Sequence, residues 1–359
     1  MSLVGPIHVQ AAYYYCRRCR CGHKPWEDVL RLGPVKLTAA AEEIVALVGC
    51  LASFADGAER TLRKLSGLRL SESTVERTTE AAGQRVRQRL NSGKTLGPSL
   101  AWLWQLDAFG KRCAYISLDA TGVRQQGPGG KHAEGKMAYV AMIYNPRSKH
   151  DPNRPPPRQV RYISGFYDLN ELGRQLHNEA LEVGWLNAER QIALSDGGNG
   201  LEDFVKRFFP KAVCILDFWH AKEYLVELGQ SHYSEDEAAR KAWLDDMCHR
   251  LKHEGGPAVR KLLEEMDLAS ASAKAREQHH DTLRYFRNHE HRMDYPTYVR
   301  NGWQIGSGPV ESACKTVVGN RLKGGGMRWG KDGSDAVSHL RGLYLSEPAC
   351  WESFWNTSP

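Results

Sequence analysis

Apolar residues change their spacing along the chain, and these changes predict where helices give way to strands. In the first quarter of the sequence they recur at helical intervals in three stretches, 37–54, 58–65 and 71–90. Gly67 interrupts the pattern before the third stretch, and Ser71 or Ser73 is suited to cap the helix that follows. We therefore expect the last two stretches to form a helix-turn-helix-like pair.

The middle of the chain has short apolar runs that are typical of buried strands. They occupy residues 113–118, 137–144, 159–166, 191–194 and 212–216. Helical spacing at 169–183 and 201–208 separates the last three runs, and a proline-rich stretch at 146–157 separates the second from the third. This order is that of an RNase H-like sheet, in which the first strand pairs antiparallel with the second and lies parallel beside the fourth.

Composition and charge narrow the class of partner. The chain has 359 residues, a formal net charge of +7 and a pI near 8.9, which favours a polyanionic partner. Its apolar stretches fall short of the roughly 18 residues that span a bilayer, and the N-terminus lacks a secretory signal pattern. Most of the nine cysteines are scattered singly, which is not a disulfide framework. We expect a cytoplasmic protein with no membrane partner.

Two aspartates follow strands that are expected to be neighbours. Asp119 ends the first predicted strand, and Asp196 ends the fourth. Since the carboxyl ends of neighbouring parallel strands meet at one edge of a sheet, the two side chains should converge. Carboxylate oxygens suit hard cations, so we expect Mg²⁺ or Mn²⁺ here. The alternative is that each aspartate only forms a turn or caps a helix.

Glu311 is the preferred third carboxylate. It lies early on a predicted helix, after Gly306 and Gly308 and just beyond Pro309, which fits a first helical turn. The alternative for Glu311 is an electrostatic role at the helix start.

Five segments extend this pattern over nearly the whole chain. They read LDATG at 118–122, SDGG at 195–198, DFWH at 217–220, GSGPVES at 306–312 and RLKGGGMRW at 321–329. In this order they resemble the transposases of bacterial insertion sequences of the ISKra type, whose organisation is similar to that of Mutator-like elements. The resemblance implies an RNase H-like core interrupted by an all-helical insertion. It also implies that Asp119, Asp196 and Glu311 hold two metal ions for phosphoryl transfer on DNA.

Asp217 and His220 match an Asp-x-x-His signature that such transposases carry just after the fifth strand. Three residues apart on a helix, they share a face. The resemblance implies that both belong to the catalytic site, where His220 would bind the scissile phosphate or orient the carboxylates. The alternative is a structural pair between the two side chains.

Basic residues follow Glu311 closely. They are Lys315, Arg321, Lys323 and Arg328, and Trp329 comes directly after them. We expect the cations to contact DNA phosphates and Trp329 to stack on an unpaired base. The alternative is a solvated, charged helix end.

Arg77 and Arg85 lie on the second helix of the helix-turn-helix-like pair. In DNA-binding units of this kind the second helix enters the major groove, so both are candidate DNA-binding residues. The alternative is a helical hairpin with a purely structural role.

A cysteine cluster near the N-terminus is a candidate zinc site. Cys16 and Cys19 have zinc-knuckle spacing, and Cys21 and His23 would complete four ligands, although crowded ones. The resemblance leads us to expect a further cysteine pair upstream, which this chain lacks, so either the true start lies further upstream or the copy is truncated. The alternative is free surface thiols.

Together these features predict an α/β protein with an RNase H-like mixed sheet, flanking helices, an all-helical insertion, and an N-terminal helical DNA-binding region preceded by a partial zinc-knuckle-like segment. The expected divisions are 1–35 for that segment, 36–97 for the helix-turn-helix-like region, 98–221 for the first part of the catalytic core, 222–301 for the insertion and 302–359 for the C-terminal helices of the core.

The predicted function is a DDE-type transposase that cuts insertion-sequence ends and transfers strands into target DNA. It would act on double-stranded DNA as a dimer or a larger assembly. One alternative is a catalytically silent or truncated derivative that only recognises element ends, and another is a structure-specific nuclease of the same fold.

Overall fold

The computed structural model describes residues 1–8, 10, 12–26, 37–146, 159–198 and 200–357. Nearly all of the proline-rich stretch at 146–157 and the end of the 1–35 segment lie outside the described residues. The strands are β1 (Tyr14–Tyr15), β2 (Gly22–His23), β3 (Gln105–Leu106), β4 (Arg112–Gln126), β5 (His132–Tyr144), β6 (Val160–Gly165), β7 (Arg190–Ser195) and β8 (Val213–Leu216).

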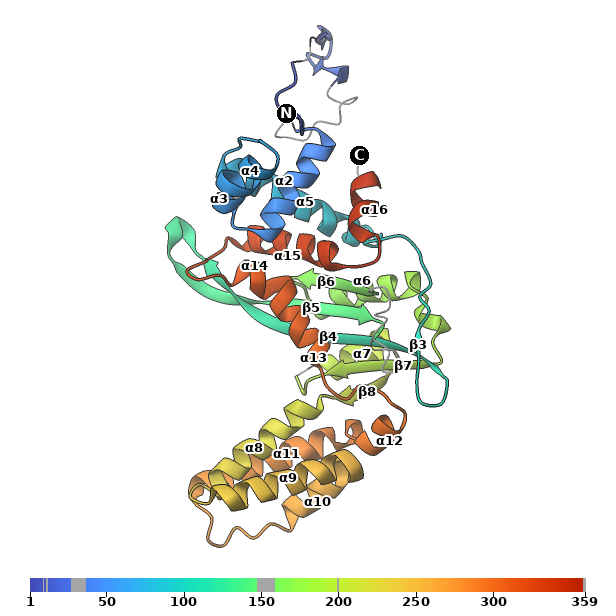
Figure 1. Ribbon diagram of the computed structural model, residues 1–359, viewed down its shortest axis with the longest axis vertical. Coiled ribbons are helices and arrows are strands. Elements are labelled where there is room, and N and C mark those ends of the chain that lie inside the picture. Colours follow the sequence, from blue (N-terminus) through green and yellow to red (C-terminus); the bar gives the residue numbers. More distant parts are fainter. Residues whose placement is uncertain (9, 11, 27–36, 147–158, 199, 358–359) are drawn as a thin grey trace.

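Helices surround these strands on several sides (Figure 1). Those before and within the sheet region are α2 (Ala39–Leu51), α3 (Phe54–Asp56), α4 (Arg63–Leu65), α5 (Glu72–Asn91), α6 (Leu169–Glu182) and α7 (Leu201–Phe208). The later ones are α8 (Phe218–His232), α9 (Glu237–Glu254), α10 (Gly256–Glu264), α11 (Ala273–His289), α12 (Tyr295–Arg300), α13 (Gly308–Ala313), α14 (Asn320–Leu322), α15 (Lys331–Leu345) and α16 (Cys350–Thr357).

The main sheet is mixed, with the order β6-β5-β4-β7-β8, and β3 pairs with β4 at its start. Strand β4 runs antiparallel to β5 and parallel to β7, and β7 runs parallel to β8. The predicted order of strands and helices is thus confirmed, as is the expected pairing of the first strand with the second and the fourth.

The first strand is much longer than predicted, and this corrects the expectation that Asp119 ends it. Strand β4 continues to Gln126 because β5 goes on pairing with it, and Asp119 lies opposite Val140 within that ladder. The pairing with β7, in contrast, stops at Ser117 and Leu194. Asp119 is therefore the second residue beyond the end of the parallel ladder but remains inside the antiparallel one, whose far end projects from the sheet (Figure 1).

Alternate residues of the strands enter two hydrophobic clusters, as the period of two requires. Tyr115 and Leu194 lie in a cluster shared with α8 and α13. Ile116 and Ala193 lie in a second cluster shared with α6 and α7. The sheet is consequently buried on both faces, which explains why its strands read as continuous apolar runs.

The N-terminal helices pack on the sheet through α15 (Figure 1). Ser71 caps α5 by accepting a hydrogen bond from the Thr74 amide, and Gly67 breaks the chain before it with a φ of +69°. A Cβ at Gly83 would lie 2.0 Å from the Ala336 carbonyl oxygen, so α5 and α15 meet backbone to backbone. The predicted pair of helical stretches is present, but its second helix is packed between other helices.

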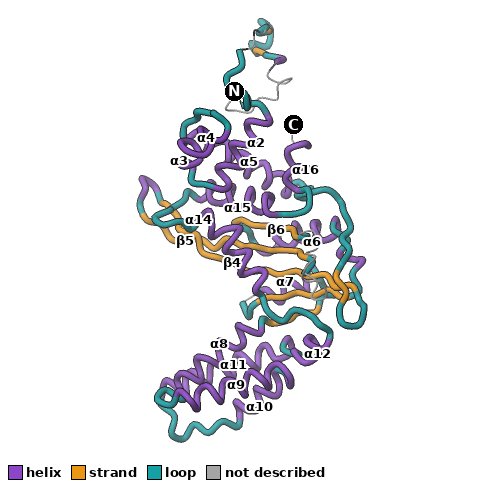
Figure 2. The backbone as a smooth tube through the Cα atoms, viewed as in Figure 1, coloured by secondary structure: helices purple, strands orange, loops and turns teal. Residues whose placement is uncertain are grey.

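Helices α8 to α12 form a bundle beyond the β8 edge of the sheet (Figures 1 and 2). The bundle joins the sheet through Tyr295, whose hydroxyl donates to the Leu216 carbonyl. Across the described residues, every helix is too short or too polar to cross a membrane.

Candidate functional site

A cavity of about 460 Å³ opens at the edge of the sheet where β4, β7 and β8 lead toward α8 and α13. The polar residues lining it are Asp119, Asp196, Asp217, His220, Glu223, Ser307 and Glu311. All five residues proposed from sequence as catalytic therefore line one cavity, although they come from segments nearly 200 residues apart.

Asp119 is half-buried in the floor of this cavity. Its Oδ1 accepts the backbone N–H of Ala120 at 2.6 Å, and its Oδ2 lies 3.4 Å from the Cys314 thiol. Burial raises the pKa of Asp119, and the nearby Asp196 and Glu311 carboxylates raise it further, whereas the two hydrogen bonds oppose the rise. Positive charge delivered to this cavity would therefore stabilise the ionised carboxylate.

The Cys314 side chain is buried directly behind Asp119. Burial raises the pKa of Cys314, and the Asp119 carboxylate adds to the rise, so the thiol stays protonated at neutral pH. A protonated thiol donates, and the S–H···O contact orients one oxygen of Asp119.

Asp196 follows β7 directly, as predicted. Its Oδ1 accepts the Gly198 amide at 2.9 Å, and its Oδ2 lies 4.0 Å from Nε2 of His220. The other ring nitrogen of His220 is 3.4 Å from Glu223. His220 thus lies between the carboxylates of Asp196 and Glu223 rather than against Asp217, so the geometry of the described residues does not support the alternative of an Asp217–His220 pair.

Asp217 is 1% exposed, and its two oxygens are both engaged. One accepts the amides of Trp219 and Ser307 at 3.1 Å each, and the other accepts the Ser307 hydroxyl at 2.8 Å. Ser307 Oγ also lies 2.6 Å from Glu311 Oε1. One hydroxyl proton serves one acceptor at a time, so Ser307 links Glu311 to Asp217, and Asp217 acts as a positioning residue.

Arg292 reaches the site from the helical bundle and is 2% exposed. Its Nη2 donates to Ser195 Oγ at 2.9 Å and to the Asp196 carbonyl at 3.1 Å. Its Nη1 lies 3.8 Å from Glu202, a carboxylate of α7. The bundle therefore fixes the backbone that carries Asp196.

The basic residues after Glu311 divide into two groups. Lys315, Lys323 and Arg328 are exposed, and the Lys323 ammonium donates to Thr121, two residues beyond Asp119. Arg321 is 2% exposed, donates to the Gly49 carbonyl, and lies over the rings of Phe54 and Trp329.

Arg321 and Trp329 are corrections to the predicted DNA contacts. Trp329 is 8% exposed, and its indole N–H donates to the Leu322 carbonyl. The two side chains bury each other between the N-terminal helices and the projecting hairpin, since Trp329 also pairs with Gln125. Their role is to hold these layers together, because neither presents its polar or aromatic surface to a ligand.

The two arginines of α5 also differ. Arg77 is exposed and donates to the Ser73 carbonyl within its own helix. Arg85 pairs with Glu42 at 2.5 Å and lies over the rings of Phe354 and Trp355. Arg85 therefore packs α5 against α2 and α16 while its side chain stays 30% exposed, and Arg77 is exposed, so both remain predicted DNA contacts.

The N-terminal cysteines lie on the exposed β1–β2 hairpin, where the Cys16 amide donates to the Cys21 carbonyl. Within the described ranges, no three His, Cys, Asp or Glu side chains are already gathered closely enough to hold a metal ion. This applies to Cys16, Cys19, Cys21 and His23. It applies equally to the cavity carboxylates, which would have to turn toward one another. Their all-oxygen donor set nevertheless fits a hard divalent cation.

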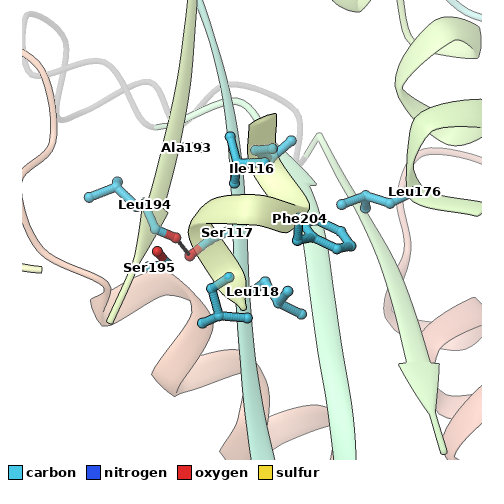
Figure 3. A pocket seen from close by; sticks show the side chains of 10 residues that line it. Ile116, Ser117, Leu118, Leu176, Ala193, Leu194, Ser195 and Phe204 are labelled. Carbon is cyan, nitrogen blue, oxygen red and sulfur yellow. Dashed lines mark hydrogen bonds between the residues drawn. The ribbon is translucent and has the colours of Figure 1, made fainter. Parts of the chain in front are cut away.

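A second void lies between β4, β7 and the helices α6 and α7. It measures only about 10 Å³ and is lined almost entirely by apolar side chains such as Ile116, Leu176 and Phe204 (Figure 3). Its dashed contact in Figure 3 is the Ser117 hydroxyl donating to the Leu194 carbonyl. This space is core packing and is too small to admit a ligand.

Sequence reasoning missed four contributors to the site. Ser307, Cys314 and Trp219 lie in or beside the recognised segments, so their position was a usable signal. Arg292 carried none, because it is 96 residues from Asp196 within an ordinary charged helical stretch. A comparison with protein-family models finds no match, and a comparison with curated proteins finds none either.

Proposed function

We propose that this protein is a DDE-type DNA transposase with an RNase H-like catalytic core, which cleaves DNA at insertion-sequence ends and joins it to target DNA. The observation that carries the proposal is the meeting of Asp119, Asp196 and Glu311 at one cavity, from two neighbouring parallel strands and a distant helix. The sheet order, in which the central strand β4 pairs antiparallel with β5 and parallel with β7, supports it.

The proposed cofactor is a pair of Mg²⁺ or Mn²⁺ ions held by Asp119, Asp196 and Glu311. When bound, such ions activate an attacking oxygen and stabilise the leaving oxygen of a phosphodiester. The protein's own part is positioning: Cys314 orients Asp119, Arg292 fixes the backbone of Asp196, and Ser307 directs Glu311.

Accessible cations would bring the DNA to this cavity. Lys315, Lys323, Arg328 and Arg77 are exposed and suited to phosphate contacts, and His220 lies at the rim beside Asp196. Because two element ends must be cut and joined together, the active form would be a dimer or a larger assembly on DNA.

The test is cleavage of labelled DNA that carries the flanks of the gene, with Mg²⁺ or Mn²⁺ present. We expect metal-dependent cuts at the flank ends. The rate of cleavage should fall about a hundredfold or more in Asp196→Asn, since the variant removes one of the carboxylates proposed to hold the metal ions that stabilise charge in the transition state. Asp203→Asn is the matched control, because Asp203 is exposed on α7 and lies outside the cavity.

Each outcome assigns a function. Binding of the flanks without cutting, in both the unmodified protein and Asp196→Asn, would replace the proposal with a recognition-only derivative. Metal-dependent cutting that ignores the flank sequence would favour a structure-specific nuclease. If the protein neither binds nor cuts the DNA, a role on DNA is refuted.

A further inference from the structure

Trp219 is an aromatic side chain that the core does not use. It is 56% exposed, although it is the second residue of α8, a helix whose inner face is buried through Phe218, Ala221 and Leu225. The indole lines the same cavity as Asp119, Asp196 and Glu311. An exposed indole beside a carboxylate site requires an explanation that packing does not supply.

The backbone around Trp219 holds the indole in place. Its amide donates to the buried Asp217, and its ring meets Phe218 edge to face at 5.7 Å. A Cβ at Gly306 would lie 3.1 Å from two atoms of the indole edge, so glycine leaves room for the ring there. The indole is thus anchored along one edge while more than half of its surface faces solvent.

A cation adjoins the same ring. The Lys222 ammonium lies 5.1 Å from the centroid of the Trp219 ring, one helical turn further along α8. Lysine and an exposed aromatic ring together match the two parts of a nucleotide, since the cation suits the phosphate and the ring suits the base.

We propose that Trp219 is a stacking platform for an unpaired base at the end of the DNA strand that is cut, with Lys222 contacting the adjoining phosphate. This inference rests on the proposed function and adds a substrate feature to it: the protein would prefer DNA ends that are frayed or single-stranded over ends that are fully paired. A base in a closed duplex keeps its faces covered by its neighbours, whereas an unpaired base offers a free face to the indole.

The role first expected of Trp329 therefore passes to Trp219. Trp329 is buried beneath Arg321, so it has no free ring face near the cavity. Trp219 has both the exposure and the position, because it is 56% exposed and lines the cavity together with His220 and Glu223.

The experiment measures binding in a background that does not cut, Asp196→Asn. The probes are two fluorescent duplexes carrying the flanks of the gene, one blunt and one with a short unpaired tail at the element end. Trp219→Leu keeps an apolar side chain without an aromatic face, and Trp219→Phe restores the face. Phe109→Leu is the matched control, because Phe109 is an aromatic residue of similar exposure, 62%, in the turn between β3 and β4.

We expect the tailed duplex to bind more tightly than the blunt one. Trp219→Leu should weaken the tailed duplex about tenfold and leave the blunt one unchanged, because one base–aromatic stack is lost. Trp219→Phe and Phe109→Leu should both stay close to the background protein. Equal binding of the tailed duplex by Trp219→Leu and its background would overturn the inference alone, while failure of the background to bind either duplex would overturn the proposed function with it.

Discussion

Replacing Arg292 with methionine tests how the helical bundle supports the site. The Arg292 side chain is almost fully buried, and one of its nitrogens donates to both Ser195 Oγ and the Asp196 carbonyl. Methionine retains an unbranched apolar chain of comparable reach but has no donor. The variant Arg292→Met therefore removes the hydrogen bonds and the charge while disturbing the surrounding packing little.

The expected loss can be worked out from these contacts. Hydrogen bonds to a charged group contribute about 1.5–3 kcal/mol each, so two such bonds at the lower value give about 3 kcal/mol. Glu202 adds little to this sum, because its carboxylate keeps Lys206 at 2.7 Å and His291 at 2.9 Å when Arg292 is gone. We expect Arg292→Met to lower the free energy of unfolding by about 3 kcal/mol, and Arg292→Lys to lower it less.

The assay is urea unfolding followed by circular dichroism, with Arg300→Met as the control. Arg300 is exposed on α12, and its hydrogen-bond partner among the described residues is Thr297 at 3.4 Å, so its replacement should change the free energy by less than about 0.5 kcal/mol. If Arg292→Met unfolds at the same urea concentration as Arg300→Met, the buried guanidinium does not hold the bundle to the sheet and the reasoning is wrong.

Three further predictions concern other links. Partial burial alone would raise the pKa of Glu202, but hydrogen bonds from its neighbours outweigh burial and lower the pKa to about 2. The stability of the protein should therefore fall as the pH drops from 4.5 toward 2, and it should fall less steeply in Glu202→Gln. Thermal melts across that pH range will measure this. Ser307→Ala should raise the Mg²⁺ concentration needed for half-maximal DNA cleavage about tenfold or more, because the hydroxyl that positions the third carboxylate, Glu311, is lost. Titration of cleavage with Mg²⁺ measures this. Gly83→Ala should cost about 2 kcal/mol in urea unfolding, because its new methyl group would overlap the Ala336 carbonyl.

Each of these has a contradicting result. If the melting temperature of Glu202→Gln falls with pH as steeply as that of the unmodified protein, the carboxylate contributes no pH-dependent stability. For Ser307, the control is Ser312→Ala, an exposed serine beside Glu311; equal Mg²⁺ curves for the two variants would remove the positioning role. For Gly83, the control is Gln84→Ala on the exposed side of α5, and an equally stable Gly83→Ala protein would mean that α5 and α15 can separate without cost.

The sequence predicted the sheet well because strand order depends on local spacing. The predicted runs at 191–194 and 212–216 match β7 and β8 to within a residue at each end. The length of β4 escaped prediction, because residues 119–126 contain Thr, Gly, Arg and Gln and show no apolar alternation. What extends that strand is the ladder to β5, which is a tertiary contact.

In the candidate site, too, some residues could be predicted from the sequence and others could not. Asp196 was predictable, since it directly follows a strand whose end is marked by glycines. Arg321 and Trp329 were misassigned because an arginine and a tryptophan in one basic segment look alike in sequence whether the two side chains face DNA or each other. Only the arrangement of the N-terminal helices, which brings Phe54 over Arg321, decides between the two.

The contacts around Asp217 explain how a helical bundle can interrupt the core without opening the site. The chain leaves the sheet at Phe218 and returns at Ile305, and the amide of the first donates to the carbonyl of the second at 2.9 Å. Asp217 accepts the Ser307 amide at the same point, and the Ser307 hydroxyl lies between the Asp217 and Glu311 carboxylates. Because the first and last residues of the insertion are hydrogen-bonded to each other, the bundle can be inserted without separating the segments that carry the site. Inserted domains commonly have such adjacent ends. The bundle then makes a separate contact with Asp196 through Arg292, so loss of Ser307 should affect the third carboxylate while loss of Arg292 should affect the second.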